Sequence, residues 1–374
     1  MFRARSIQSS LSIKDKIISI DYILVITIFI LGLTSILAMY STDGGELKYH
    51  TRSHIIRFFV FFGMFLTVSF IQIRFWHSQS YIIYILFFIL LLGVKYFGLT
   101  SSGSKRWLDL YFMNLQPSEL MKVGLILFLA KYYHRTSIEN LNRVRYLFLP
   151  IVVLIAPIIL VATQPDLGTA LLIAAGGLTV AWLAGVRVKF FAISGLAFLA
   201  LLPIAISFLK PYQKTRILTF LNPERDPLGA GYQIIQSKIA IGSGGLFGKG
   251  FLQGSQSYLD YLPEKHTDFI FTLFSEEFGF FGSLFILFLY AIIIWRIIKI
   301  GNVTRSNFGK LFCYGFGTAF FVYVVVNMMM VLGLLPIVGS PLPIMSYGGS
   351  SMMAIMLGLG IVMSCKIYKD TPVN

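Results

Sequence analysis

The sequence contains few charged residues, and acidic residues are the scarcest of them. Asp and Glu number 16 against 31 Lys and Arg, and charged residues make up only 13% of the 374 residues. A soluble domain has about a quarter of its residues charged. Hydrophobic residues reach 56%, with 35 Phe and 19 Tyr, which is more than a water-soluble core of this size can bury. The shortage of charge therefore excludes an ordinary soluble domain and indicates a protein whose solvent is lipid.

Cysteine is scarce as well. Cys313 and Cys365 lie inside apolar runs without neighbouring metal ligands, which excludes a disulfide framework. The net charge of +15 is compatible with nucleic-acid binding, but the basic residues lie in short clusters between apolar stretches, as in cytoplasmic loops of membrane proteins. We therefore expect no nucleic-acid partner. The basic tail 1–20 leads into an apolar run without a small-residue cleavage site, so no cleaved signal is expected.

Long apolar runs fill most of the chain. Helices of about 17–25 apolar residues cross bilayers, because backbone groups in lipid must satisfy each other's hydrogen bonds. The sequence predicts an all-α polytopic membrane protein. Its ten predicted transmembrane helices are residues 21–41, 54–72, 80–98, 118–134, 146–163, 169–185, 190–208, 268–296, 310–334 and 344–366. They form one domain over residues 21–366, between an N-terminal tail, 1–20, and a C-terminal tail, 367–374.

The Lys and Arg clusters predict the orientation of these spans. They lie before the first span and after the second, fourth, sixth, eighth and tenth: Arg3, Arg5, Lys14, Lys16, Arg74, Lys131, Arg135, Arg143, Arg145, Arg187, Lys189, Arg296, Lys299, Arg305, Lys310, Lys366 and Lys369. All of these fall on one side, so the positive-inside rule places both termini in the cytoplasm.

This orientation leaves two unusual segments outside the cytoplasm. One is the connection 99–117, and the other is the long extracytoplasmic loop 209–267 between spans seven and eight. A loop of this length is more often functional than idle. Within it, residues 231–241 predict a short amphipathic helix. The glycine-rich stretch 242–250 lacks the strand–loop–helix context of a nucleotide site, so we expect turns there.

Asp268 is the principal catalytic candidate. It lies at the boundary between a polar approach and the apolar run 269–274, where a carboxylate is partly desolvated and close to lipid headgroups. Such a position suits a general base that acts on a lipid-linked substrate.

Two ionisable residues begin the fourth span. Glu119 and Lys122 are three residues apart and lie on one face of the expected helix, after Pro117 and Ser118. Charges at membrane depth are costly unless they are paired or line a wet cavity. Two interpretations stay open: a structural ion pair, or a polar floor of a site in which Lys122 contacts a phosphate.

Other candidates lie near the predicted outer surface. Asp166 predicts an N-cap of the sixth span and is also placed to orient a cation. Lys105 and Arg106, beside Trp107, are either headgroup anchors or pyrophosphate contacts. Arg216 and Lys238 in the long loop, and more weakly Arg57, raise the same question.

His266 and Ser346 are weaker candidates. His266 is isolated in the sequence from other His and Cys residues, which disfavours a metal site there, and no metal ligand is assigned. Ser346 lies at the end of the proline-rich segment 333–347, which predicts an interrupted or re-entrant entry to span ten. Irregular backbone of this kind is tolerated in a membrane where it lines a cavity.

Several motifs together resemble the SEDS family (shape, elongation, division and sporulation). They are Lys105–Asp109, Gln116–Lys122, Gln164–Thr169, Phe220–Pro223, Gly231–Gly250, Leu262–Phe269 and Pro341–Ser351. The similarity extends over nearly the whole chain from residue 21. The short cytoplasmic tail and the amino-acid sequence of residues 222–227 favour the elongation branch over the division branch.

The resemblance implies a peptidoglycan glycosyltransferase in the bacterial cytoplasmic membrane that polymerises lipid II at its outer face. It implies a class B penicillin-binding protein transpeptidase as partner, with other elongation-complex proteins and membrane lipids. By this similarity Asp268 matches an essential carboxylate, and Glu119, Lys122 and Asp166 match cavity residues. A divalent cation, Mg²⁺ or Mn²⁺, is a further expected aid to the departing pyrophosphate.

Two other classes of function remain open at this point. A flippase that moves lipid II across the bilayer also uses many helices and intramembrane charges, but it favours groups near the midplane and repeat symmetry. A noncatalytic scaffold for cell-wall enzymes would tolerate loss of Asp268. The division-type paralogue shares the same predicted chemistry.

Overall fold

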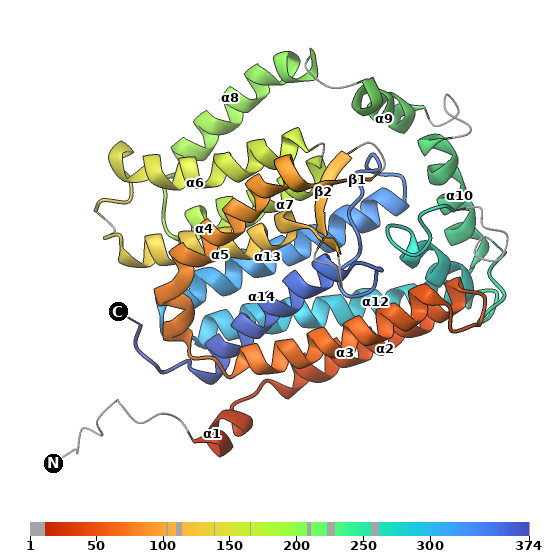
Figure 1. Cartoon of the computed structure of the whole chain (residues 1–374), viewed down its shortest axis with the longest axis horizontal. Coiled ribbons are helices and arrows are strands. Elements are labelled where there is room, and N and C mark those ends of the chain that lie inside the picture. The colour runs from red at the N-terminus through yellow and green to blue at the C-terminus, as the bar shows by residue number, and fades with distance from the viewer. Residues whose placement is uncertain are drawn as a thin grey trace.

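The computed structural model describes residues 12–101, 104–109, 114–137, 139–164, 166–207, 211–222, 229–255 and 262–373. Most of these residues are helical, and the long helices run side by side (Figure 1). In chain order the helices are α1 (Ile13–Ile18), α2 (Tyr22–Thr42), α3 (Tyr49–Ser69), α4 (Ile73–Phe97), α5 (Pro117–Arg135), α6 (Val144–Thr163), α7 (Leu167–Leu183), α8 (Val188–Ser207), α9 (Pro211–Leu221), α10 (Ala230–Ser243), α12 (Ile270–Val303), α13 (Asn307–Val331) and α14 (Gly349–Ile367).

Each predicted span coincides with one of these helices, although the boundaries differ. Seven helices within the described residues are long and apolar enough to cross a membrane: α2, α3, α4, α6, α12, α13 and α14. The remaining predicted spans correspond to α5, α7 and α8. The protein is therefore a mostly helical, multi-pass membrane protein, and the full count of ten spans stays a prediction.

α5 is polar for a membrane helix because it is surrounded by protein. It contacts α4, α6, α7, α13 and α14, and its residues from Pro117 to Lys131 are buried. A charge on such a helix faces neighbouring side chains instead of acyl chains, which removes most of its cost. The central position explains how one helix holds Glu119, Lys122 and Lys131.

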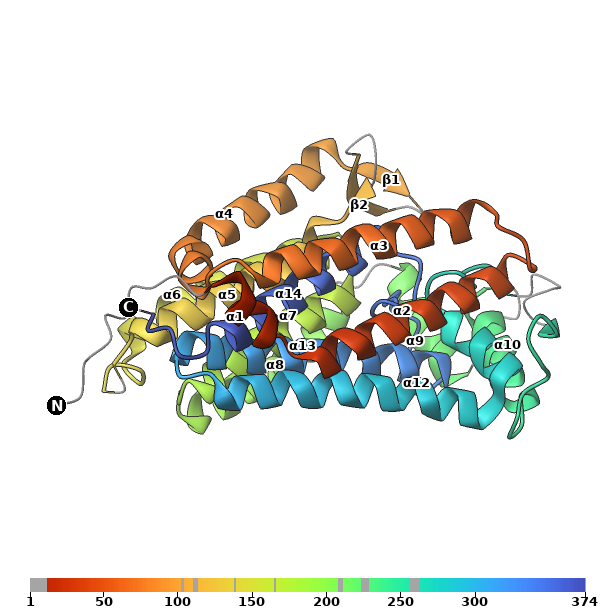
Figure 2. The same ribbon diagram turned by 90° about the horizontal axis from the view of Figure 1, so that it is seen from below.

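The two ends of the helical bundle differ. α1 and the last turn of α14 lie at one end, whereas the strands, α10 and the start of α12 lie toward the other (Figures 1 and 2). The end that carries α1 also carries Arg74 and Lys369 at helix boundaries. Two of the predicted basic boundary residues therefore lie at this end, and the orientation of the spans stays a prediction.

The connection between α4 and α5 was not expected to contain strands. It forms a small antiparallel sheet of β1 (Leu99–Ser101), β2 (Ser104–Asp109) and β3 (Asn114–Leu115), in the order β1-β2-β3. The prediction of an all-α chain is wrong here. A segment outside the helices must still pair its backbone groups, and pairing with itself in hairpins satisfies them.

The predicted long loop 209–267 is also more structured than expected, because it contains α9 and α10. The short helix predicted over residues 231–241 is confirmed as α10. Its Ser237 hydroxyl donates to the Val331 carbonyl at 2.7 Å and lies 2.8 Å from the Thr272 hydroxyl. These contacts dock α10 on α12 and α13.

The glycine-rich stretch forms turns, as predicted, and these turns cover a break in α12. Gly279 has φ +66°, which interrupts the helix. The amides of Lys249 and Gly250 donate to the carbonyls of Glu276 and Glu277, each at 3.0 Å. A Cβ added at Gly248 would lie 2.0 Å from the Glu277 carbonyl oxygen, so only glycine allows this approach. Predicted span eight, 268–296, is therefore a broken helix that continues to Val303.

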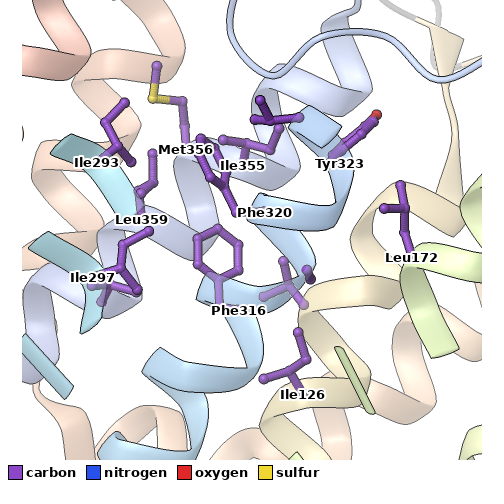
Figure 3. Close-up of a cluster of buried hydrophobic side chains, with 14 of the residues drawn as sticks. Ile126, Leu172, Ile293, Ile297, Phe316, Phe320, Tyr323, Ile355, Met356 and Leu359 are labelled. Atoms are coloured by element: carbon purple, nitrogen blue, oxygen red, sulfur yellow. The ribbon is translucent and has the colours of Figure 1, made fainter. Parts of the chain in front are cut away.

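The hydrophobic core is centred on α13. Phe316 and Phe320 face Ile297 of α12 and Leu359 of α14, and Tyr323 lies one turn further along the helix with its hydroxyl pointing away from this cluster (Figure 3). The Tyr323 hydroxyl instead lies beside Glu119 and Ser351.

α14 begins at Gly349, later than the predicted span start at residue 344. The residues between α13 and α14 are not helical, yet Leu342, Ile344 and Met345 are buried. The predicted interrupted entry is confirmed, and protein surrounds this irregular backbone as the low-dielectric membrane interior requires.

Candidate active site

Asp268 lies in the turn that precedes α12, and its side chain is partly buried. Its carbonyl oxygen accepts a hydrogen bond from Asn327 Nδ2 at 3.0 Å, and the same amide donates to the Ser340 carbonyl at 2.7 Å. The carboxylate faces the irregular backbone, because a Cβ added at Gly339 would lie 3.7 Å from Asp268 Oδ2. Asn327 thus ties Asp268 to the segment between α13 and α14.

The loop before Asp268 is fixed by the segment that contains Ser346. The Ser346 hydroxyl donates to the Thr267 carbonyl at 2.6 Å and accepts from the Leu342 amide at 2.7 Å. The Tyr347 amide donates to the His266 carbonyl at 2.8 Å. Ser346 is buried, so its hydroxyl has a positioning role and holds the backbone that leads into Asp268.

Glu119 and Lys122 form the ion pair that their spacing predicted. Lys122 Nζ lies 2.8 Å from Glu119 Oε2, and both residues are buried. The Tyr323 hydroxyl donates to Glu119 at 3.3 Å and lies 3.0 Å from the Ser351 hydroxyl, while the Lys122 ammonium lies 4.0 Å above the Tyr323 ring. The pair therefore joins α5, α13 and α14. The ion pair is present, while its structural role and the phosphate contact of Lys122 both stay predictions.

Asp166 caps α7, as predicted. Its Oδ1 accepts from the Thr169 amide at 3.1 Å, and its Oδ2 accepts from Gln116 Nε2 at 2.9 Å. The backbone amide of Gln116 donates to the Ser350 hydroxyl at 2.9 Å. Asp166 therefore connects the starting ends of α5, α7 and α14.

Tyr323 is the side chain that these acidic residues have in common. Its hydroxyl bonds Glu119, and Asp166 and Asp268 also act on it electrostatically, although the three come from different segments. The structure thus places the principal catalytic candidate, Glu119, Lys122 and Asp166 within electrostatic range of one tyrosine.

The cationic candidates Lys105, Arg106, Arg57 and Lys238 differ in their contacts. Arg106, in β2, donates from Nε to the Gln164 carbonyl at 3.0 Å, which ties the sheet to the end of α6. Lys105 is exposed. The Arg57 guanidinium lies 4.6 Å from the centre of the Tyr347 ring. Lys238 is exposed on α10, and a Cβ at Gly333 would lie 2.4 Å from its Cε. The side chain of Arg216 lies outside the described part of the structure.

His266 is not isolated, and this corrects the sequence interpretation. Its ring stacks on that of His50, with centroids 4.2 Å apart. Its Nε2 lies 3.7 Å from Asp43 Oδ1. The sequence hides this neighbourhood because His50 begins α3, whereas His266 precedes α12.

Several residues of the site were missed by the sequence analysis. Asn327 is the most important, and its signal is a single amide inside the apolar run of α13. Tyr323 lies in the predicted span 310–334 and Gln116 begins the motif Gln116–Lys122, but neither side chain carries a charge. Apart from this site, Glu276 and Glu277 are buried at the α12 break, where Lys249 Nζ lies 2.6 Å from Glu276 Oε1.

Comparison with known proteins identifies the family. The model of the FtsW, RodA and SpoVE family, described as a cell cycle protein, matches residues 16–371. The chain belongs to this family. The predicted SEDS resemblance is thus confirmed.

Relatives with described roles share most of their length with this family member. It is 44% identical to peptidoglycan glycosyltransferase MrdB of Escherichia coli K12, over 82% of this chain and 83% of that one. Stage V sporulation protein E of Bacillus subtilis is 36% identical, over 78% of this chain and 80% of that one.

Solved structures share the fold. A chain from a structure described as "Structural coordination of polymerization and crosslinking by a peptidoglycan synthase complex" matches with a TM-score of 0.81 and 31% identity, covering 94% of this chain and 99% of that one. The rod shape determining protein RodA of Thermus thermophilus matches with a TM-score of 0.71 and 26% identity, covering 94% and 97%.

Proposed function

We propose that this protein is a peptidoglycan glycosyltransferase that polymerises lipid II during cell elongation, with Asp268 as the general base. Relatives named peptidoglycan glycosyltransferases support the activity. The elongation role is supported by 44% identity to MrdB, against 37% to a probable FtsW of Tolumonas auensis. The observation that supports the residue assignment is the fixed placement of Asp268 beside Gly339, with Asp268, Glu119 and Asp166 all in electrostatic range of Tyr323.

The reaction joins a sugar hydroxyl of one lipid-linked unit to the anomeric carbon of another. As the new C–O bond forms, the bond to undecaprenyl pyrophosphate breaks and Asp268 takes the proton of the attacking hydroxyl. A positioned base contributes about 10²–10⁴-fold to such a rate. Because Asn327 and Ser346 hold the backbone on both sides of Asp268, the carboxylate meets the acceptor without reorganisation.

Charge that develops on the pyrophosphate requires cations at the same end of the protein. Lys122 is already paired with Glu119, so it contributes mainly by setting the charge of the site floor. Lys105 is exposed and Arg106 lies beside it on β2. We assign the pyrophosphate contacts to these two residues, with Lys238 and Arg57 as weaker candidates.

The proposed topology has ten spans, both termini in the cytoplasm and the site at the outer face of the cytoplasmic membrane. The seven apolar helices and the central position of α5 support it. The placement of α1 and the end of α14 together, away from the start of α12, also supports it (Figures 1 and 2). Substrates with prenyl tails then enter from the surrounding lipid.

The proposed partner is a class B penicillin-binding protein transpeptidase, which cross-links the strand that this protein makes. The similarity to a chain from a peptidoglycan synthase complex supports this partnership. Other elongation-complex proteins and membrane lipids complete the expected surroundings.

An in vitro polymerisation assay with purified protein and lipid II tests the proposal. Asp268→Asn is expected to lose activity by about 10²–10⁴-fold while its melting temperature is unchanged, because the backbone contacts of residue 268 remain. Glu264→Gln is the matched control, since Glu264 is an exposed carboxylate in the same loop, bonded to Thr267 Oγ1 at 2.9 Å. An Asp268→Asn protein that polymerises at the wild-type rate would refute the assignment.

The same assay separates the polymerase from the flippase. Polymerisation in detergent needs no sealed membrane, whereas flipping does. The polar residues of the site gather near the starting ends of α5, α7 and α12, away from mid-helix, which favours polymerisation over alternating access.

A further inference from the structure

Asp43, His50 and His266 form a cluster at the end of the protein where α12 begins. Asp43 follows α2, His50 lies in the first turn of α3, and His266 lies in the loop that ends at Asp268. Asp43 Oδ1 lies 3.7 Å from His50 Nδ1 and 3.7 Å from His266 Nε2. Their ligand atoms all lie within 4.8 Å of one another, and no other three acidic, His or Cys side chains do so within the described residues.

Thr42 helps to orient the His266 ring. The Thr42 hydroxyl donates to the Met39 carbonyl at 2.8 Å and lies 3.0 Å from His266 Nδ1. Because Nδ1 lies beside Thr42, Nε2 is the ring nitrogen that lies toward Asp43, 3.7 Å from Oδ1. A neutral imidazole with its proton on Nδ1 offers Nε2 to a metal ion, and this is the tautomer that a bound ion would select.

Asp43 is oriented in a similar way. Its Oδ2 accepts from the Thr51 amide at 2.9 Å and from the Thr51 hydroxyl at 2.6 Å. Because Oδ2 is engaged with Thr51, Oδ1 is directed at the two histidines. Metal ligands in proteins are commonly held by such outer hydrogen bonds to the atom that does not bind the ion.

The separations suit one ion. Two ligand atoms that bind an ion at about 2.1 Å, with an angle between tetrahedral and trigonal, are about 3.4–3.6 Å apart. The two Asp–His separations of 3.7 Å are close to this value. Two imidazoles and one carboxylate are ligands that Zn²⁺ accepts readily, and Mn²⁺ shares the preference for carboxylate oxygen.

The cluster is also accessible. His50 and His266 line an open cavity of about 510 Å³ with Tyr347 and the loop 262–267. The His50 side chain is 42% exposed and its ring stacks on that of His266, so binding of one ion by both rings requires the His50 ring to rotate.

We propose that Asp43, His50 and His266 bind one divalent transition-metal ion of the Zn²⁺ or Mn²⁺ type. The ion ties the α2–α3 turn to the loop 262–268, which the Tyr347 amide holds through the His266 carbonyl at 2.8 Å. Because this loop ends at Asp268, occupancy of the site stiffens the segment that carries the carboxylate. Ion binding itself is independent of the proposed polymerase activity.

The test uses the full chain without an affinity tag, purified in detergent and stripped with chelator. Titration with Zn²⁺ by calorimetry, and with Mn²⁺ by electron paramagnetic resonance, is expected to show one ion per chain. His50→Gln and His266→Gln are each expected to weaken binding at least tenfold, since each removes one of three ligands. His134→Gln is the control, because His134 pairs with His77 at 5.3 Å without a carboxylate.

Thermal melting distinguishes loss of the site from loss of the fold. In chelator, His50→Gln is expected to have the same melting temperature as the wild type, because His50 is half-exposed. Added ion is then expected to raise the melting temperature of the wild type and of His134→Gln, and to leave His50→Gln unchanged. A wild-type protein that binds neither ion at millimolar concentration overturns the proposal, as does wild-type affinity in both His50→Gln and His266→Gln.

Discussion

Asp268 and Glu119 are acidic residues of the same candidate site, yet the protein holds them in different ways. Asp268 is partly buried, and neutral hydrogen bonds through Asn327 and Ser346 fix its backbone. Glu119 is buried, and a cation, Lys122, holds its side chain directly. The carboxylate of Asp268 is therefore positioned through its main chain, whereas that of Glu119 is neutralised inside the bundle.

This difference has a physical basis. A buried charge without a partner is very costly, so Glu119 needs Lys122 for the fold to form at all. The backbone contacts around Asp268 hold it in place for the acceptor hydroxyl, which is what a general base requires. We therefore expect substitutions at Asp268 to affect activity alone and substitutions at Glu119 and Lys122 to affect stability first.

The largest effect is expected for Lys122→Ala. Breaking a buried ion pair leaves an uncompensated charge and lowers the free energy of unfolding by about 3–5 kcal/mol. Denaturant unfolding in micelles measures this loss, and activity should fall in proportion to the unfolded fraction. The double variant Glu119→Gln/Lys122→Met removes both charges and should recover most of the stability. If Lys122→Ala is inactive but fully stable, Lys122 contacts substrate and the contrast with Asp268 fails.

A smaller effect on stability, with a clear effect on activity, is expected for Asn327→Leu. The change removes the donor to the carbonyls of Asp268 and Ser340, which costs about 1–3 kcal/mol for buried acceptors. Because Asp268 is then no longer tied to the segment beside Gly339, the polymerisation rate of the folded fraction should also fall. Asn302→Leu, at the exposed far end of α12, is the control. An unchanged rate per folded molecule would show that Asp268 needs no such support.

The smallest effect is expected for Asp166→Ala. Loss of an N-cap costs about 0.5–2 kcal/mol, and the Gln116 side chain loses its acceptor at the same time. Asp166→Asn keeps an acceptor for the Thr169 amide and should lose less than half as much. Thermal melts of the two variants check this order, and equal losses would assign the charge of Asp166, and not its capping, as the stabilising factor.

The sequence predicted much of the local structure of the site. The three-residue spacing of Glu119 and Lys122 predicted their ion pair, and Asp before an apolar run predicted the cap of α7. The prolines between residues 333 and 347 predicted the interrupted entry to α14. These are interactions within a few residues, in which helix geometry alone decides what meets what.

Other features were not predictable from local patterns. The strands between α4 and α5 and the turns that cover the α12 break depend on backbone groups that no residue type announces. His266 was wrongly interpreted as isolated, because its neighbour His50 is distant in the sequence. Asn327 gave a signal, a lone amide in an apolar helix, but not the identity of its partner.

The sequence by itself determined that lipid is the solvent, which stretches become helices and where their polar boundaries lie, because hydrophobic transfer and capping act residue by residue. Only the tertiary structure decided which boundaries share a site. Asn327 of α13 and Gly339 meet Asp268, and the packing of α5 and α7 against α13 brings Glu119 and Asp166 into electrostatic range of the same Tyr323. Those contacts join residues far apart in the chain, and their free energy comes from the fit of whole helices, which local patterns do not contain.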